Sequence, residues 1–105
     1  METDELRRFI RDRLDEDERR LAREELPLLD EAEARGRLRV VRSDDGAGLL
    51  LLPGPIQAAE ERDLVPFKEK VPLVRAEVER TDDVAVLRLL AAAFDTHHDW
   101  QEEWR

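Results

Sequence analysis

Apolar side chains recur every three or four positions near the start of the chain, among residues that are mostly charged. Leu6, Phe9, Ile10 and Leu14 fall on one face of a helix, and Leu21 lies one heptad beyond Leu14. Acidic residues occupy the first turn, where they favour a helix N-terminus. The pattern predicts a long N-terminal helix that packs one apolar face against the rest of the chain.

This apolar face is interrupted at Asp17 and Glu18, where a further apolar residue is due. Under one interpretation, the helix rotates or frays away from the core at this point. Under the other, Asp17 makes a polar contact with a partner, which makes it a candidate interaction residue. The sequence leaves both interpretations open.

A different pattern begins at residue 37. Leu38 and Val40 alternate with arginines, the segment SDDGAG at 43–48 is rich in turn-forming residues, and a run of four leucines follows. This order predicts a β-hairpin over about residues 37–52. A buried helical turn is the alternative interpretation of the leucine run.

The second strand of the predicted hairpin is apolar on both faces. One hairpin on a small helical domain covers only one face of such a strand, so the other face needs more of this chain, a second copy or another protein. We therefore expect a homo-oligomer through this strand, or contact with a protein partner there. The candidate interaction residues are Leu49, Leu50, Leu51 and Leu52.

Prolines divide the remainder of the chain. Pro27 marks a boundary, after which a short helix is expected to end at Gly36. Four prolines between residues 53 and 72 indicate a connector with a short helical piece around 57–62. Pro72 suits the first position of the helix that follows.

The last helical pattern runs from about residue 72 to 94 and is expected to form one helix, or a pair divided near Thr81 and Asp82. An aromatic tail follows it. The whole chain, residues 1–105, is expected to form a single small domain of the mainly α class with a small β-hairpin (α+β).

The composition restricts the classes of function. Charged residues make up 43% of the chain, the net charge is −9, and the absence of cysteine excludes disulfides and thiolate chemistry. The net charge is −5 over residues 1–35, +1 over 36–76 and −5 over 77–105. Acidic ends around a near-neutral middle argue against direct nucleic-acid binding and against an anionic membrane surface. With no apolar run long enough for a membrane span and no leader pattern, the bacterial host cytoplasm is the expected location.

The tail DTHHDWQEEWR holds the chain's two histidines and two tryptophans. His97 and His98 could supply metal ligands, but adjacent histidines point in different directions and no further histidine completes a set. We therefore expect no metal, cofactor or catalytic site and no enzymatic activity. Trp100 and Trp104 are expected to close as a clasp on the preceding helices or to dock on a partner, and His97 accompanies them as an interaction candidate.

The segments FIRDRLDEDE near the start and VLRLLAAAFDTHHDWQEEW at the end resemble an actinobacterial and actinobacteriophage family of unknown function. That family opens with an FLRxRLDEDE helix and closes with an LRLLAxxYxDHPDYxxEW tail. The matching positions are Phe9, Arg11, Arg13, Leu14, Asp15, Glu16, Asp17, Glu18, Leu87, Arg88, Leu89, Leu90, Ala91, Phe94, His97, Asp99, Trp100, Glu103 and Trp104. The resemblance covers the two ends only, and His98 stands where the family has proline.

These features favour a binding role. The expected function is that of a small non-catalytic accessory protein of phage or prophage type, which acts by protein–protein interaction. The alternative is an acidic nucleic-acid mimic that inhibits a host DNA- or RNA-binding protein through the DEDE run at 15–18 and the C-terminal acids. The interleaved Arg19, Arg20 and Arg23 weaken this alternative, because a mimic gains from unbroken negative potential.

Overall fold

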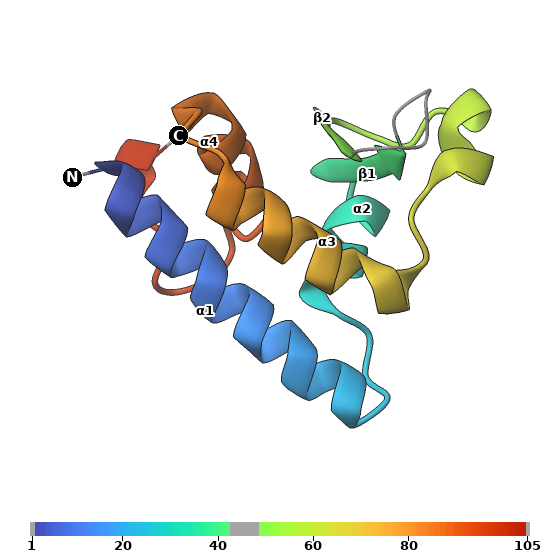
Figure 1. Ribbon diagram of the computed structural model, residues 1–105, viewed down its shortest axis with the longest axis horizontal. Helices are drawn as coiled ribbons and strands as arrows, with labels where there is room; N and C mark the ends of the chain where they lie inside the picture. Colours follow the sequence, from blue (N-terminus) through green and yellow to red (C-terminus); the bar gives the residue numbers. More distant parts are fainter. Residues whose placement is uncertain (1, 43–48, 105) are drawn as a thin grey trace.

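The computed structural model describes residues 2–42 and 49–104. Within these residues the chain forms, in order, α1 (Glu2–Ala22), α2 (Leu28–Ala34), β1 (Leu38–Arg42), β2 (Leu49–Pro53), the 3₁₀ helix η1 (Ala58–Asp63), α3 (Phe67–Arg80), α4 (Val84–Ala92) and the 3₁₀ helix η2 (Glu102–Trp104). In Figure 1, α1 runs alongside α3, and the hairpin lies next to α2. The predicted class, mainly α with a small β-hairpin, is confirmed. No helix of the described residues is long and apolar enough to cross a membrane.

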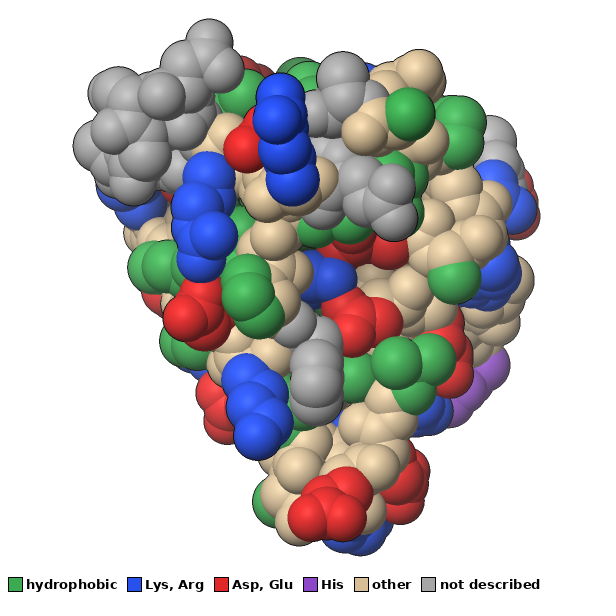
Figure 2. Space-filling model, turned by 90° about the vertical axis from the view of Figure 1, so that its right-hand side faces the viewer, with side chains coloured by type: hydrophobic (Ala, Val, Ile, Leu, Met, Phe, Trp, Pro, Cys, Tyr) green, Lys and Arg blue, Asp and Glu red, His purple; other side chains and the backbone are tan. Residues whose placement is uncertain are grey.

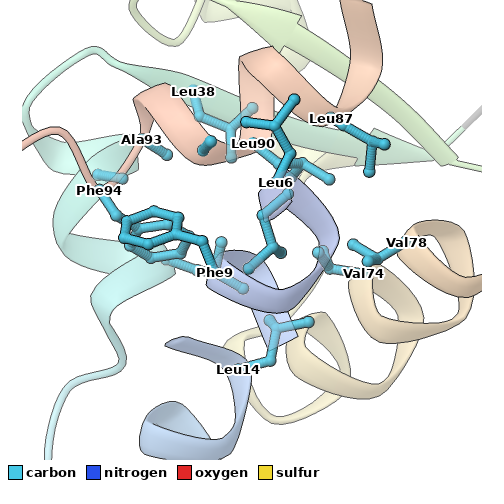
Figure 3. Close-up of a cluster of buried hydrophobic side chains, with 14 of the residues drawn as sticks. Leu6, Phe9, Leu14, Leu38, Val74, Val78, Leu87, Leu90, Ala93 and Phe94 are labelled. Atoms are coloured by element: carbon cyan, nitrogen blue, oxygen red, sulfur yellow. The ribbon is translucent and has the colours of Figure 1, made fainter. Parts of the chain in front are cut away.

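The core lies between α1, α3, α4 and the inner side of β1 (Figure 3). The predicted apolar face of α1 is buried there, with Leu6, Ile10 and Leu14 fully covered and Phe9 nearly so. The side chains that meet them come from the three other elements: Val71, Val74, Val78, Leu87, Leu90, Leu38 and Val40. The prediction of a long N-terminal helix with one buried face is confirmed.

The short second helix has the boundaries that its proline and glycine predicted. Pro27 occupies the N-cap position with φ −63°. At the other end, Gly36 has φ +74°, a conformation that favours glycine. The Gly36 N–H donates to the Glu33 carbonyl at 3.0 Å, and the Arg37 N–H donates to the Ala32 carbonyl at 2.9 Å. These bonds end α2 and turn the chain into β1.

The C-terminal segment forms a pair of helices, which is one of the two arrangements expected. Residues 81–83 separate α3 from α4, and Thr81 is extended with ψ 139°. The Asp83 carboxylate accepts a hydrogen bond from the Ala85 N–H at 2.9 Å and so caps α4. The division lies where it was expected, with the cap one residue beyond Asp82.

The prediction for Pro72 is wrong. α3 begins at Phe67, directly after Pro66, and Pro72 lies inside it. The missing N–H of Pro72 would have bonded to the carbonyl of Lys68, four residues earlier. Both residues are exposed, so water is available to that carbonyl. The connector therefore ends earlier than expected and contains η1, where a short helical piece was predicted.

β1 and β2 form the predicted hairpin. The strands are antiparallel, with Val40 opposite Leu51 and Val41 opposite Leu50. This pairing excludes the interpretation of the leucine run as a helical turn. The predicted turn, residues 43–48, lies outside the described residues.

Candidate functional site

The strand β2 contains four consecutive leucines, yet it is the less buried strand of the hairpin. On β1, Val40 and Val41 are buried, whereas no residue of β2 is. Leu49 and Leu51 pack partly against the core, and Leu50, on the opposite face, is 44% exposed. Large apolar side chains gathered at a surface are typical of an interaction site.

Cross-strand pairing shows which side chains share the outer side of the hairpin. Leu50 lies opposite Val41 and Leu52 lies opposite Arg39, and the side chains of paired residues point to the same face. We name these four residues the hairpin outer face. The Arg39 guanidinium donates to the Pro53 carbonyl, which keeps its aliphatic stem along the strands. Figure 2 shows the side of the molecule on which the hairpin and η1 lie, where hydrophobic side chains reach the surface among arginines and lysines.

The two strands of the hairpin contain no acidic residue, in an otherwise acidic protein. β2 carries no charge, and β1 and the residue before it bring Arg37, Arg39 and Arg42. Arg42 lies 2.7 Å from Glu69 on α3, and Arg37 lies 3.4 Å from Asp95 after α4. The surface around the leucines is thus close to neutral, while both ends of the chain are strongly negative.

The edge of β1 that faces away from β2 is closed by the chain itself. The Val40 carbonyl accepts a hydrogen bond from the Val65 N–H at 3.2 Å. The Val40 N–H also acts on the Glu33 carboxylate and opposes the rise in its pKa. Leu64 forms a further bridge with Val41. The Val40 carbonyl is therefore satisfied on that side, and the bridge to Leu64 closes the edge of β1.

A buried ion cluster lies beside this edge. Lys70 of α3 is 4% exposed, and its ammonium contacts the carboxylates of Asp30 and Glu33 on α2. Burial raises the pKa of Glu33, and the Lys70 ammonium opposes that rise. The three side chains line a shallow hollow of about 280 Å³, together with the apolar residues Ala34, Ile56, Leu64 and Val65.

This cluster was not predicted from the sequence. Its signal was present: Lys70 is one of two lysines beside sixteen arginines, and it precedes the buried Val71 on α3. Asp30 and Glu33 are spaced i,i+3, which places both carboxylates on one side of α2. Nothing in the sequence showed that α2 and α3 would meet. Since the ammonium neutralises its neighbours within the molecule, we assign the cluster a structural role.

His97 is held by α1. Its Nδ1 accepts a hydrogen bond from the Arg13 guanidinium at 2.8 Å and another from the Asp99 backbone N–H at 3.1 Å. Arginine can only donate, so Nδ1 carries no proton in this arrangement. Burial lowers the pKa of His97, and the neighbouring Arg13 and His98 lower it further. A neutral His97 therefore joins the tail to α1.

The geometry of the adjacent histidines opposes a metal centre. His97, His98 and Asp99 place one ligand atom each within 4.8 Å of one another. The two rings are stacked, however, with centroids 4.3 Å apart and planes inclined by 25°. A nitrogen lone pair lies in the plane of its ring, so stacked rings do not direct two lone pairs to one point. The Arg13 guanidinium also occupies Nδ1 of His97 and brings a positive charge to that place.

Both tryptophans belong to the core. Trp100 and Trp104 are nearly fully buried. The Trp104 ring packs against Phe9 of α1 with centroids 5.1 Å apart, and Phe9 also contacts Phe94 at 6.3 Å. The clasp closes on α1 as well as on α4. The alternative, in which the two rings project to dock on a partner, conflicts with this burial.

Asp17 is fully buried, although it was a candidate for contact with a partner. Its carboxylate accepts hydrogen bonds from the backbone N–H groups of Leu28 and Leu29 at the start of α2. α1 continues past Asp17 to Ala22 without fraying. Both interpretations of the interrupted apolar face are therefore wrong, because the polar contact is internal.

No protein-family model matches the sequence, and no curated protein or solved structure gives a match. Of the sequence candidates, Asp17, Trp100, Trp104 and His97 are engaged within the chain. Leu50 of β2 is exposed, and Leu49, Leu51 and Leu52 are partly buried.

Proposed function

We propose that this is a small non-catalytic accessory protein of phage or prophage type, which acts in the bacterial cytoplasm by binding another protein through the hairpin outer face. The observation that carries the proposal is the incomplete burial of β2, where Leu50 is 44% exposed and no leucine is buried. Fully burying one leucine is worth about 1.5–3 kcal/mol, so a partner that covers Leu50 and Leu52 gains substantially. The resemblance of the two chain ends supports the phage assignment.

The ionisable clusters favour binding over catalysis. A general base or nucleophile must reach a substrate. The Lys70 ammonium instead contacts Asp30 and Glu33, and the His97 Nδ1 accepts from Arg13. These groups satisfy one another inside the molecule.

The acidic DEDE run at 15–18 is paired with arginines, and this pairing disfavours nucleic-acid mimicry. Arg75 of α3 bonds to Asp15 at 2.8 Å and to Glu18 at 3.0 Å. Arg13 lies 3.5 Å from Glu16. Carboxylates that are paired with arginines present a weaker negative potential than an unpaired run. We therefore keep the hairpin as the proposed site.

The test is capture of a partner from an actinobacterial lysate by three forms of the protein. The wild type should retain a protein that the double variant Leu50→Asp, Leu52→Asp loses. The control is Leu73→Asp, since Leu73 is a 38% exposed leucine on α3, away from the hairpin. All three forms should melt at similar temperatures. Capture of the same protein by the double variant would reject the hairpin outer face as the site.

A further inference from the structure

β2 has one neighbouring strand, β1, and its other edge has properties of a strand-pairing site. We propose that β2 pairs antiparallel with β2 of a second copy of this chain, so that two hairpins form one continuous sheet. This proposal rests on the proposed role of the hairpin as an interaction surface. It adds a second copy of the chain as a partner at the edge of β2. The edge and the hairpin outer face are distinct, because pairing uses the backbone groups at the edge of β2, whereas the outer face is formed by side chains on one side of the sheet.

The hydrogen bonding of Val40 shows which way the backbone of β2 points. The Val40 carbonyl accepts from the Val65 N–H on the side away from β2, and Val41 forms a bridge with Leu64 on that same side. Val40 and Leu51 are therefore a pair without mutual hydrogen bonds. In such a pair, the N–H and C=O of each residue point to the outer edges of the sheet. Leu51 thus directs its backbone groups outward, and so does Leu49, two residues earlier.

β2 itself carries few of the features that normally protect an edge strand, although α4 contacts this strand. Exposed edges usually carry charges, bulges or a covering segment. β2 has no charged residue, its register with β1 is regular from Leu49 to Pro53, and only Pro53 opposes pairing. On β1, the corresponding edge is covered by Leu64 and Val65. The two edges of the sheet thus differ in their protection.

Charge favours a second copy as the occupant. The chain carries −9 overall, with −5 on residues 1–35 and −5 on 77–105, so most approaches of two copies bring like charges together. Residues 36–76, which contain the hairpin, carry +1, and β2 itself carries none. An uncharged leucine strand is also complementary to itself in antiparallel pairing. The two-fold arrangement repeats the same contact on both copies.

The backbone groups also set the register. Pro53 has no N–H, and its carbonyl already accepts from Arg39. The N–H and C=O groups of Leu49 and Leu51 are the outward pairs that remain, and they satisfy each other when Leu49 of one copy lies opposite Leu51 of the other. The two-fold axis then passes between the two Leu50 residues. Their Cα atoms would be about 4.5 Å apart, as in other antiparallel pairs without mutual hydrogen bonds.

Disulfide trapping tests this register, since the chain has no native cysteine. Leu50→Cys should cross-link two copies under mild oxidation, because about 4.5 Å between Cα atoms is within disulfide range. Leu52→Cys is the matched control on the same strand and face. Its copies would lie roughly 13 Å apart, too far for a bond. Equal cross-linking at both positions, or none at Leu50→Cys, would overturn the pairing.

Sedimentation equilibrium tests the edge itself. The wild type should reach twice the 12.3 kDa chain mass as its concentration rises. Leu51→Pro removes an N–H that points away from β1, so the variant should remain folded by circular dichroism. The dissociation constant of its dimer should rise at least tenfold. Leu51→Val, which keeps the N–H, should dimerise. Should Leu51→Pro fail to fold, the wild-type mass and the disulfide test decide the inference. A wild type that stays monomeric at high micromolar concentration, or a folded Leu51→Pro that still dimerises, would overturn it.

Failure of the dimer and failure of the proposed function can be distinguished. A folded monomer of Leu51→Pro keeps the side chains of Leu50 and Leu52, so it should still capture the protein partner. Loss of the dimer with capture retained would show the two contacts to be independent. Loss of capture in Leu50→Asp, Leu52→Asp, with capture intact in Leu51→Pro, would assign the partner to the outer face alone.

Discussion

The carboxylate of Asp17 accepts a hydrogen bond of 2.6 Å from the backbone N–H of Leu28, eleven residues later in the chain. A second bond of 3.3 Å comes from the Leu29 N–H. The N-cap residue of α2 is Pro27, which offers no side-chain acceptor, so α1 supplies the cap from outside the helix. The N-terminus of α2 also favours a negative charge. Asp17 therefore fixes how α2 sits on α1.

Stability should depend on pH through Asp17. Burial raises the pKa of Asp17 from 3.8 to about 6, although the bonds from Leu28 and Leu29 oppose the rise. The folded state then binds the proton more tightly than the unfolded state, so stability should fall as pH rises from about 4 to about 6. One pKa unit corresponds to about 1.4 kcal/mol, so this group alone should change the free energy of unfolding by roughly 3 kcal/mol.

Urea unfolding across this pH range measures the effect. Asp17→Asn cannot titrate, so the difference in unfolding free energy between wild type and variant should change between pH 4 and pH 7. Asp15→Asn, at an exposed position of the same helix, is the control. Parallel pH profiles for the wild type and Asp17→Asn would contradict the assignment.

The outcome at Asp17 shows what the sequence could predict. The apolar face of α1 is a local property, repeated every turn, and the pattern of Leu6, Ile10 and Leu14 was sufficient to find it. The hairpin was equally local, since alternation and turn residues lie side by side in the chain. The interruption of the apolar face at Asp17 was visible in the sequence. The backbone groups that Asp17 contacts, however, depend on the path of the chain after Pro27.

The same limit applied to the candidate site. The leucines of β2 were predicted to form an interaction surface because the strand is apolar on both faces, and this is evident within four consecutive residues. The contacts between Lys70 and Glu33, and between Arg13 and His97, join residues that are distant in the sequence. A single sequence can mark such residues as unusual, but it does not show which of them meet before the fold is known. Pro72 was misplaced for another reason, since an exposed helix position tolerates a missing hydrogen bond.

Metal ions should not affect stability. The stacked rings of His97 and His98 and the Arg13 guanidinium on Nδ1 oppose coordination. Addition of zinc or of EDTA should therefore leave the melting temperature unchanged. His97→Ala should cost roughly 1–3 kcal/mol, because it removes an acceptor from the buried Arg13. His98→Ala, at an exposed position, should cost little. Zinc stabilisation that disappears in His97→Ala would restore the metal site.

Acidification should weaken the contribution of His97. Its pKa is lowered by burial and by Arg13, so the folded state resists protonation more than the unfolded state does. The stability contributed by the neutral ring should be lost as pH falls below the ordinary value of 6.5. This dependence opposes that of Asp17 in sign. The difference in unfolding free energy between wild type and His97→Gln should therefore shrink as the pH is lowered, and an unchanged difference would contradict it.

The buried Lys70 should be essential for folding at neutral pH. Lys70→Met keeps the aliphatic stem but leaves the carboxylates of Asp30 and Glu33 without their cation. Breaking a buried ion pair in this way costs about 3–5 kcal/mol. Part of the loss should be recovered at pH 5, because burial raises the pKa of Glu33 and favours its neutral form. Lys68→Met, at an exposed position of the same helix, should be close to neutral. A Lys70→Met protein that melts like Lys68→Met would show that the cluster contributes little.

The tryptophans should stabilise the fold rather than bind a partner. Trp104 packs on Phe9, and Trp100 is buried in the same core. Alanine at either position should cost roughly 3–5 kcal/mol, which is a large part of the 5–15 kcal/mol typical of small domains. Trp104→Phe keeps an aromatic ring against Phe9 and should lose less than Trp104→Ala. Thermal melts measure the loss, and capture of the partner is followed at a temperature where each variant remains folded. If Trp104→Ala melted like the wild type but no longer captured the partner, the tail would be the interface, and the assignment of the site to the hairpin outer face would be wrong.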